Sequence, residues 1–374
     1  MPTASALPRR RSEADPLTEQ TSPLHAALAS ARPQLPLHPR PIVSIGSGGI
    51  VRDAHMPAYR AAGFPVAVAV DQNSEKSQAL AADFNIPCAT TSIAEAVAFA
   101  PRDCIFDVAV PAGALLDVLP QLPDGAAVLL QKPMGNTLAE AEQILALCRS
   151  KGMTAAVNFQ LRWAPVMIAA RSLTTAGVLG ELHDMEVKVS VRTPWELWSF
   201  LATAPRLEIL YHSIHYVDLV RSWFGTPERV YAKTVRNPRT PALAPTKSVI
   251  IMDYGEWKRV FITTNHAHTF QGSQHSYVQW EGTTGAMKAV MGVNLDYPIG
   301  RPDTLTYAPL DSEWQTLPTT GNWFPEAFIG SMGSLQSFVT GETNDLPTSV
   351  EDAIQTMRVV EAAYLSSESG GAAI

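Results

Sequence analysis

Short apolar segments alternate with segments of helical spacing between residues 41 and about 160. The apolar segments are PIVSIG, VAVAVD, CIFDVAV, AAVLLQ and TAAVNF, and stretches such as SEKSQALAADF and AEAEQILALCRS lie between them. Strands that are apolar on both faces and alternate with helices are typical of a parallel sheet covered on both sides. The pattern therefore predicts a doubly wound α/β domain over residues 38–160.

Polar and apolar residues alternate along several segments after about residue 160. These segments include ELHDMEVKVSV, RVYAKTV, SVIIMDY, RVFITTN and YVQWEG. A period of two predicts antiparallel strands with one face open to solvent or to a partner. We expect residues 161–374 to form an α+β domain with a large, mostly antiparallel open sheet. Its C-terminal helix, within SVEDAIQTMRVVEAAYLSS, is expected to begin at a Ser349 cap.

Residues 1–37 follow neither pattern. Arg9, Arg10 and Arg11 precede a polar, proline-bearing stretch instead of the apolar region of an export signal. The segment is therefore predicted to be a flexible arm, or one that wraps a partner.

Composition and charge restrict the classes of partner. Hydrophobic residues make up 46% of the 374 and charged residues 17%, and no window approaches the roughly 20 uninterrupted apolar residues of a membrane span. The net charge of -7 argues against nucleic acid and anionic membranes. Three cysteines without C-x-x-C spacing suggest neither a disulfide framework nor a zinc knuckle, and they fit a reducing cytoplasm. We expect a cytoplasmic protein with small-molecule partners.

A glycine-rich turn, G-S-G-G-I-V, directly follows the first predicted strand. Gly46 and Gly48 match two positions of a dinucleotide fingerprint, where backbone N–H groups approach a pyrophosphate at a helix N-terminus, whereas Val51 replaces the third small residue. Asp71 ends the second strand, where a carboxylate can bind the adenosine ribose and repel a 2′-phosphate. An ordinary turn is the competing interpretation. The pattern predicts a Rossmann domain that binds NAD, with NADP possible, through Gly46, Ser47, Gly48, Gly49, Ile50, Val51, Asp71, Pro111, Gln131 and Lys132.

Lys132 stands at the end of the AAVLL strand, between Gln131 and Pro133. Ligands of open α/β sheets gather at the carboxyl ends of strands, so this lysine is expected to point to the place of a nicotinamide ring. The proline restricts the backbone of Lys132 and could form a cis bond that fixes the direction of the amine. Without that context, a lone lysine is usually a solvated surface charge.

The chain resembles the glucose-fructose oxidoreductase, inositol dehydrogenase and MocA (Gfo/Idh/MocA) family over roughly residues 40–368. The likeness rests on the glycine turn with AHMPAYR after it, VAVAVD, VAVPAG, LLQKPMGNTLAEAEQI, AAVNFQLRW, LGEL, a His-x-x-Asp helix and LPTSVEDAIQTMRVVEAAY. The resemblance implies an NAD(P)-dependent oxidoreductase of sugars or polyols whose catalytic lysine is Lys132. The family usually has Glu-Lys-Pro, so Gln131 replaces an acid, although an amide can still form hydrogen bonds.

Three polar residues at intervals of three, His212, His215 and Asp218, occupy one stripe of the helix in EILYHSIHYVDLVRSWFG. In the family an Asp four residues before a His commonly supplies the catalytic pair; His215 matches that His, but Tyr211 stands at the Asp position. We expect His215 to act as acid/base because its pKa lies near neutral. Asp218 is expected to orient it or to be a helix-surface acid, with Tyr211 or His212 in place of the missing Asp.

Two other interpretations of these histidines stay open, namely packing of a helix and binding of a metal. Three-residue steps suit a metal less than the i, i+4 histidine pair of zinc helices, so we expect no metal.

Aromatic and polar residues near the predicted cleft suit a carbohydrate. Trp195 and Trp198 lie in RTPWELWSFLATAPRLE, and their faces suit the C–H faces of a sugar, although they could instead fill a core or an interface. Asn158, Arg162 and Trp163 follow the last strand of the first domain. The expected substrate contacts are Lys132, Asn158, Arg162, Trp163, Trp195, Trp198, His212 and His215.

The predicted function is hydride transfer between a nicotinamide cofactor and a sugar, polyol or related carbohydrate. His215 would remove the hydroxyl proton, and Lys132 would stabilise the developing alkoxide. The alternatives are an NAD-dependent glycosidase without net cofactor turnover and a non-catalytic sensor of a dinucleotide or a sugar. Lys132 and His215 argue against the sensor, whereas Gln131 and Tyr211 keep it open. The open sheet predicts a homodimer or homotetramer formed through the C-terminal domain.

Overall fold

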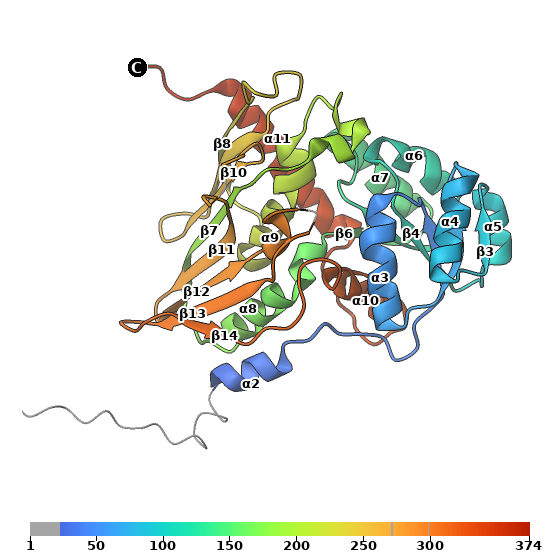
Figure 1. Cartoon of the computed structure of the whole chain (residues 1–374), viewed down its shortest axis with the longest axis horizontal. Helices are drawn as coiled ribbons and strands as arrows, with labels where there is room; N and C mark the ends of the chain where they lie inside the picture. Colours follow the sequence, from blue (N-terminus) through green and yellow to red (C-terminus); the bar gives the residue numbers. More distant parts are fainter. Residues whose placement is uncertain (1–22, 271, 298) are drawn as a thin grey trace, which may run out of the picture.

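Two sheets organise the molecule. The structure is a computed structural model that describes residues 23–270, 272–297 and 299–374. One sheet has six strands and the other has eight. Figure 1 shows the first sheet with its helices in one half of the molecule and the second sheet in the other half. This arrangement agrees with the two hydrophobic patterns of the sequence, one before and one after about residue 160.

The first sheet is parallel throughout, in the order β3-β2-β1-β4-β5-β6. Every residue of β1, β4 and β5 is buried, as expected for strands covered on both faces. The strand order reverses beside β1, and such a switch point opens a crevice at the carboxyl ends of the strands. The strands are β1 (Ile42–Ile45), β2 (Val66–Val70), β3 (Cys88–Thr90), β4 (Ile105–Val108), β5 (Ala127–Gln131) and β6 (Thr154–Asn158).

Helices from both ends of the chain cover this sheet. Those that follow its strands are α3 (Met56–Ala62), α4 (Ser74–Phe84), α5 (Ile93–Phe99), α6 (Leu115–Val118) and α7 (Leu138–Ser150). Two C-terminal helices return to it: α10 (Ala327–Val339) packs against α3, β5 and β6, and α11 (Val350–Ser369) packs against α7 and β6. The Ser349 hydroxyl caps α11 by accepting the N–H of Asp352, so the predicted start of this helix is confirmed.

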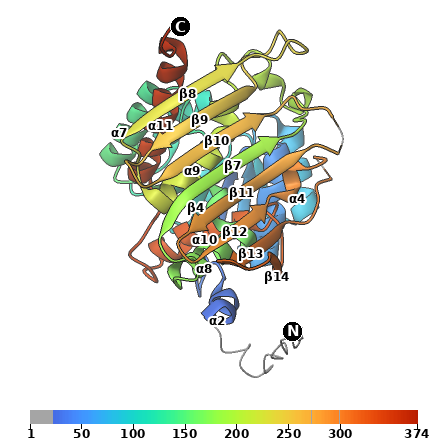
Figure 2. The same cartoon turned by 90° about the vertical axis from the view of Figure 1, so that its left-hand side faces the viewer.

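The second sheet has the order β14-β13-β12-β11-β7-β10-β9-β8 and is antiparallel except between β7 and β10. Its strands are β7 (Leu182–Ser190), β8 (Arg229–Val235), β9 (Lys247–Asp253), β10 (Arg259–Asn265), β11 (His275–Gly282), β12 (Gly285–Val290), β13 (Thr304–Pro309) and β14 (Gln315–Leu317). Helices α8 (Pro165–Thr175) and α9 (Ile214–Phe224) pack against its inner face. Figure 2 shows the opposite face turned to the viewer with no helix over it, as the alternating pattern predicts.

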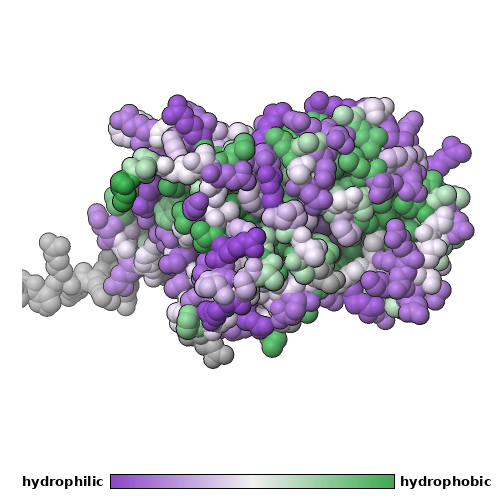
Figure 3. Space-filling model, turned by 90° about the horizontal axis from the view of Figure 1, so that it is seen from above, coloured by the Kyte–Doolittle hydropathy of each residue, from purple (hydrophilic) through white to green (hydrophobic). Residues whose placement is uncertain are grey.

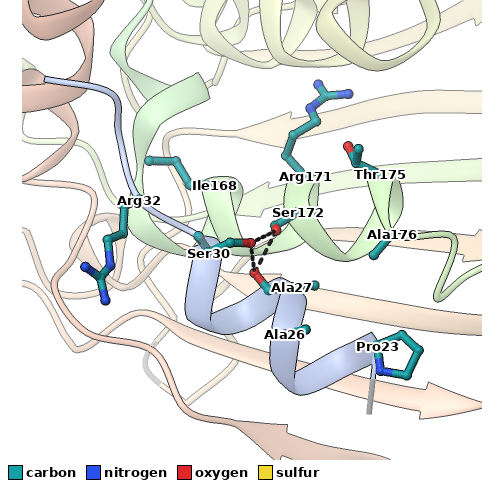
Figure 4. A pocket seen from close by; sticks show the side chains of 11 residues that line it. Pro23, Ala26, Ala27, Ser30, Arg32, Ile168, Arg171, Ser172, Thr175 and Ala176 are labelled. Atoms are coloured by element: carbon teal, nitrogen blue, oxygen red, sulfur yellow. Dashed lines mark hydrogen bonds between the residues drawn. The ribbon is translucent and has the colours of Figure 1, made fainter. Parts of the chain in front are cut away.

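The segment before β1 contains a helix that packs on the body. Helix α2 (Pro23–Ser30) lies across α8, where the Ser172 hydroxyl donates to the Ala27 carbonyl at 2.7 Å (Figure 4). Leu37 follows the same surface and donates its N–H to Glu342 Oε1 at 2.9 Å. We expected residues 1–37 to form a flexible arm, so this expectation is corrected for residues 23–37. Residues 1–22 lie outside the described residues.

The surface mixes residue types. Hydrophilic and hydrophobic residues are interspersed over the face that Figure 3 shows. Within the described part of the chain, no helix combines the length and the apolar character that a membrane span requires.

Candidate active site

The glycine turn joins β1 to a widened helical turn. Gly46 has φ of +103°, and a Cβ there would overlap the carbonyl oxygen of Ala109, so only glycine fits. A Cβ at Gly48 would meet no atom within 4 Å, which leaves its backbone open to a ligand. A π-helical turn spans Val51–His55, and Val51 is fully buried in it. The wider turn gives Val51 room at a position where the fingerprint has a smaller residue.

Asp71 lies beside this turn. One carboxylate oxygen accepts the Ser47 N–H at 2.8 Å, and the other accepts the Asn73 N–H at 2.9 Å. Two backbone donors therefore fix the carboxylate next to the phosphate-binding turn. Of the other expected cofactor contacts, Pro111 follows β4 at the same edge of the sheet and begins a short helix.

Lys132 reaches from the first sheet to the second domain. It follows β5 directly, its bond to Pro133 is cis, and its Nζ donates to the Tyr211 carbonyl at 2.7 Å. Burial lowers the pKa of the amine to about 8. The hydroxyl of Tyr211 in turn donates to Asn136 Oδ1 at 2.8 Å, so this tyrosine is bound twice to the loop between β5 and α7.

His212 and His215 share the neighbourhood of Lys132. Burial lowers the pKa of both imidazoles, and the positive charge of Lys132 lowers each of them further. The His215 ring is 7% exposed, packs edge-on against Trp323 with centroids 5.6 Å apart, and has no hydrogen-bond partner at Nδ1. The structure thus brings together the amine and the two imidazoles that sequence analysis placed in one site.

The carboxylate of Asp218 is bound by Arg162 and does not orient His215. Its two carboxylate oxygens accept hydrogen bonds from Arg162 at 2.7 and 2.6 Å, and Arg162 also donates to Asp352 at 2.9 Å. Arg221 donates to Asp352 as well, at 3.0 Å. Asp218 is 1% exposed, and its burial raises its pKa despite the neighbouring guanidinium group. One expectation is corrected: Asp218 is neither an orienting partner nor a surface acid. Arg162 belongs to a buried ion-pair network, and its expected contact with substrate stays a prediction.

Gln131 belongs to a buried network beneath Lys132. Its Oε1 accepts the Lys132 N–H at 3.0 Å, and its Nε2 lies 3.3 Å from His55 Nε2. Asp107 Oδ2 lies 2.7 Å from His55 Nδ1 and accepts the Tyr59 hydroxyl at 2.9 Å. The chain therefore carries a buried carboxylate on β4, next to the strand whose end has an amide in place of the family's acid.

The residues beneath Gln131 include two that sequence analysis missed as site residues, His55 and Asp107. His55 and Tyr59 lie in AHMPAYR, and Asp107 interrupts the apolar run CIFDVAV. A buried strand with one acid is therefore the signal that could have found them. Asn158 also faces this network, with its Nδ2 3.4 Å from His55 Nε2, and it is only 1% exposed. Asn158 thus contacts His55 in this structure, and its expected contact with substrate stays a prediction.

The expected aromatic contacts separate into two groups. Trp195 is 8% exposed and lies edge-on to His212 with centroids 4.8 Å apart, whereas Trp198 is half-buried and packs near Tyr297 at 6.0 Å. Trp163 packs against Gly330 of α10, where a Cβ would come within 2.6 Å of the indole. Of these three tryptophans, Trp195 is therefore the one that packs against His212.

Two further residues behind His212 were also missed. The imidazole of His266 lies 4.4 Å from that of His212, measured between ring centroids, and Glu208 lies 3.5 Å from His266. His266 follows β10, more than fifty residues after His212 along the chain. Only the spacing of four residues between Glu208 and His212 could have indicated the acid. Among the described residues, no group of three or more His, Cys, Asp and Glu side chains could hold a metal ion.

Comparisons with known proteins match this architecture. A family model described as "Oxidoreductase family, NAD-binding Rossmann fold" covers residues 41–159, and that of the family's C-terminal alpha/beta domain covers residues 171–373. The chain is 25% identical over 341 residues to D-xylose 1-dehydrogenase (NADP(+)) 2 of Haloferax volcanii. The alignment covers 88% of this chain and 97% of that protein. The chain is also 26% identical over 340 residues to D-apiose dehydrogenase of Paraburkholderia graminis, and this alignment covers 87% of both proteins.

A solved structure shares the fold. The oxidoreductase of Agrobacterium radiobacter, crystallised with NAD+, L-tartaric acid and magnesium, superposes with a TM-score of 0.75 at 18% identity. The superposition covers 88% of this chain and 97% of that one.

Proposed function

The chain belongs to the Gfo/Idh/MocA family of NAD-binding oxidoreductases, and from this premise we propose that it oxidises or reduces a hydroxyl-bearing carbon of a sugar, polyol or related carbohydrate. The observation that carries the proposal is the meeting of Lys132 with His212 and His215. The positive charge of Lys132 lowers the pKa of both imidazoles. Its amine donates a hydrogen bond to the carbonyl of Tyr211, the residue before His212.

The residues of the first domain fit a dinucleotide. Gly46 permits the tight turn, the backbone at Gly48 is open to a ligand, and Asp71 is fixed beside the turn by two backbone N–H groups. A carboxylate at that position binds ribose hydroxyls and repels a 2′-phosphate, which favours NAD over NADP. When bound, the nicotinamide ring would accept or donate the hydride.

Lys132 and His215 would divide the remaining chemistry. Lys132 follows β5 at the edge of the sheet where ligands gather, so its ammonium group can stabilise negative charge that develops on the substrate oxygen. His215 has a lowered pKa, so it is neutral near pH 7 and can accept the hydroxyl proton during oxidation. In the reverse direction the same imidazole would return the proton.

The relatives support a carbohydrate substrate. The two curated relatives are named as dehydrogenases of D-xylose and D-apiose, and each is matched over most of its length. Trp195 beside His212 gives the site an aromatic surface, which suits the C–H faces of a sugar.

The test is an absorbance assay of the purified protein with a panel of sugars, polyols and aryl glycosides, run in parallel with NAD and NADP. We expect net reduction of the nicotinamide ring with at least one sugar or polyol, and faster reduction with NAD. Release of an aglycone without net reduction would instead identify a glycosidase. Tight cofactor binding without either reaction would identify a sensor and refute the proposed function.

We also propose that two or four copies associate through the uncovered face of the second sheet. Four large apolar side chains of β8 and β9 are exposed on this face: Tyr231, Val235, Val249 and Ile251, with exposures of 50%, 43%, 46% and 45%. Apolar groups of this kind on an otherwise regular sheet favour self-association.

A further inference from the structure

A buried carboxylate and an imidazole lie behind His212. Both Glu208 and His266 have side chains that are at most 1% exposed. The Ser213 hydroxyl donates to Glu208 Oε1 at 2.5 Å, and Thr193 Oγ1 lies 2.8 Å from His266 Nδ1. Each member of the pair is therefore held by a hydroxyl group, which makes the geometry of the pair well defined.

Glu208 is ionised in this environment. Burial alone would raise its pKa, but the adjacent imidazole of His266, followed by the hydroxyls of Ser213 and Ser248, lowers it. A buried negative charge needs a counter-charge, because an isolated ion in the protein interior is strongly disfavoured. Among the ion pairs of the described residues, the imidazole of His266 is the partner of Glu208, with Nε2 3.5 Å from Oε1.

The positive end of this pair faces His212. The two imidazole centroids are 4.4 Å apart, and Trp195 covers the His212 ring from another side. Burial lowers the pKa of His212, and the charges of His266, Lys132 and His215 lower it further. A second cation at such a distance is unfavourable in a site of low dielectric. His212 is therefore a neutral imidazole that can accept a proton or a hydrogen bond.

We propose that Glu208 and His266 are positioning residues of the active site, whose buried ion pair keeps His212 neutral so that it accepts a substrate hydroxyl beside His215. This inference rests on the proposed function. It also accounts for the position at which the chain lacks an acid: Tyr211 precedes His215 by four residues, whereas Glu208 precedes His212 by the same interval. The carboxylate is thus one turn earlier and acts through His266.

The first test measures the protonation of His212 directly and needs no turnover. Long-range ¹H–¹⁵N spectra report the state of each imidazole, and the His212→Gln variant identifies the His212 signals. The titratable groups around His212 are Lys132 after β5, His215 on α9 and His266 after β10, with Glu208 behind His266.

Glu208→Gln keeps the side-chain shape but removes the negative charge, so the ion pair with His266 is lost. We expect His212 to titrate at least about one pH unit higher in this variant than in the unmodified chain. An unchanged titration of His212 would overturn the proposal.

Two further variants keep the test decisive. Glu361→Gln is the matched control, since Glu361 pairs with Arg206 and has no imidazole neighbour among its ion pairs, and it should leave His212 unchanged. If Glu208→Gln does not fold, the double variant Glu208→Gln/His266→Gln replaces the ion pair by two amides that can bind each other. We expect the same upward shift of His212 in that variant, and no shift would count against the pair.

Kinetics separate a positioning role from a merely structural one. With an active substrate, Glu208→Gln should lower kcat by about tenfold or more and leave NAD binding unchanged, while Glu208→Asp should restore part of the rate. Wild-type kcat in Glu208→Gln would refute the positioning role. Absence of turnover in the unmodified chain would instead refute the proposed function, and the His212 titration would still test the ion pair.

Discussion

At the scale of single residues, Lys132 is the most informative position, because one side chain reaches both domains. Its amine donates to the Tyr211 carbonyl and carries charge next to two imidazoles. Removing it should affect the reaction more than the binding of cofactor, since the glycine turn and Asp71 are separate from it.

We therefore expect Lys132→Ala to lower kcat by at least about 10²-fold, the usual effect of losing a group that stabilises transition-state charge. The Kd for NAD, measured by calorimetry, should stay within a few fold of the unmodified value. A variant with undiminished turnover would exclude the assigned role of the lysine.

The pH profile of kcat/KM for oxidation should be bell-shaped. The pKa of Lys132 is lowered to about 8, so its charge is present below that pH and is lost above it. The pKa of His215 is lowered well below 6.5, so the imidazole is a neutral acceptor above that range and is lost as a base only under more acidic conditions. We expect an alkaline limb near pH 8 that moves upward in Lys132→Arg, because arginine stays charged. A rate that keeps rising through pH 9.5 would contradict this assignment.

The sequence located Lys132, His215 and Gly46 because each belongs to a local pattern, a strand end, a helical stripe or a turn. It missed His55, Asp107, Glu208 and His266, since their partners are distant along the chain. Arg162 illustrates the same limit of sequence analysis. A guanidinium group after a strand looks like a ligand contact, but its partners Asp218 and Asp352 lie 56 and 190 residues further on.

At the scale of elements, the buried network around Arg162 joins three of them. It links the short helix after β6 to α9, which carries Asp218, and to the first turn of α11, which carries Asp352. Burial alone would lower the pKa of Arg162, but the two carboxylates raise it, so the arginine is charged and fully paired. This pairing fixes α9, and α9 carries His215.

Arg162→Met should destabilise the fold by about 3–5 kcal/mol, because it leaves a buried carboxylate without its partner. Urea unfolding followed by circular dichroism measures the change. Arg192→Ala is the control, since Arg192 forms an exposed pair with Glu196 and its loss should cost less than about 1 kcal/mol. Wild-type stability of Arg162→Met combined with a raised KM would return Arg162 to the substrate contacts.

The type of each sheet followed from periodicity, but the two π-helical turns did not. These turns, Val51–His55 and Ile209–Ser213, precede α3 and α9. Their residues have the same spacing as an ordinary helix, and only packing decides the wider turn. In the first case the buried Val51 provides a physical reason, whereas for the second the sequence gives no comparable signal.

At the scale of the whole molecule, the uncovered sheet face predicts self-association. Light scattering after size exclusion should give a mass of two or four chains of 40.4 kDa. Val249→Lys/Ile251→Lys places charges on that face and should shift the mass towards one chain without loss of fold. A monomeric unmodified protein would contradict the expected assembly.

The arrangement of the two domains determines whether the site is complete. The first domain supplies Lys132 and the dinucleotide turn, and the segment that carries His212 and His215 comes from the second. A crystal structure of the chain with NAD and a bound polyol measures this convergence most directly. We predict that Lys132 Nζ and the His215 imidazole both contact the hydroxyl whose carbon faces the nicotinamide ring. A nicotinamide ring bound elsewhere, or a substrate hydroxyl that neither side chain touches, would contradict the proposed active site.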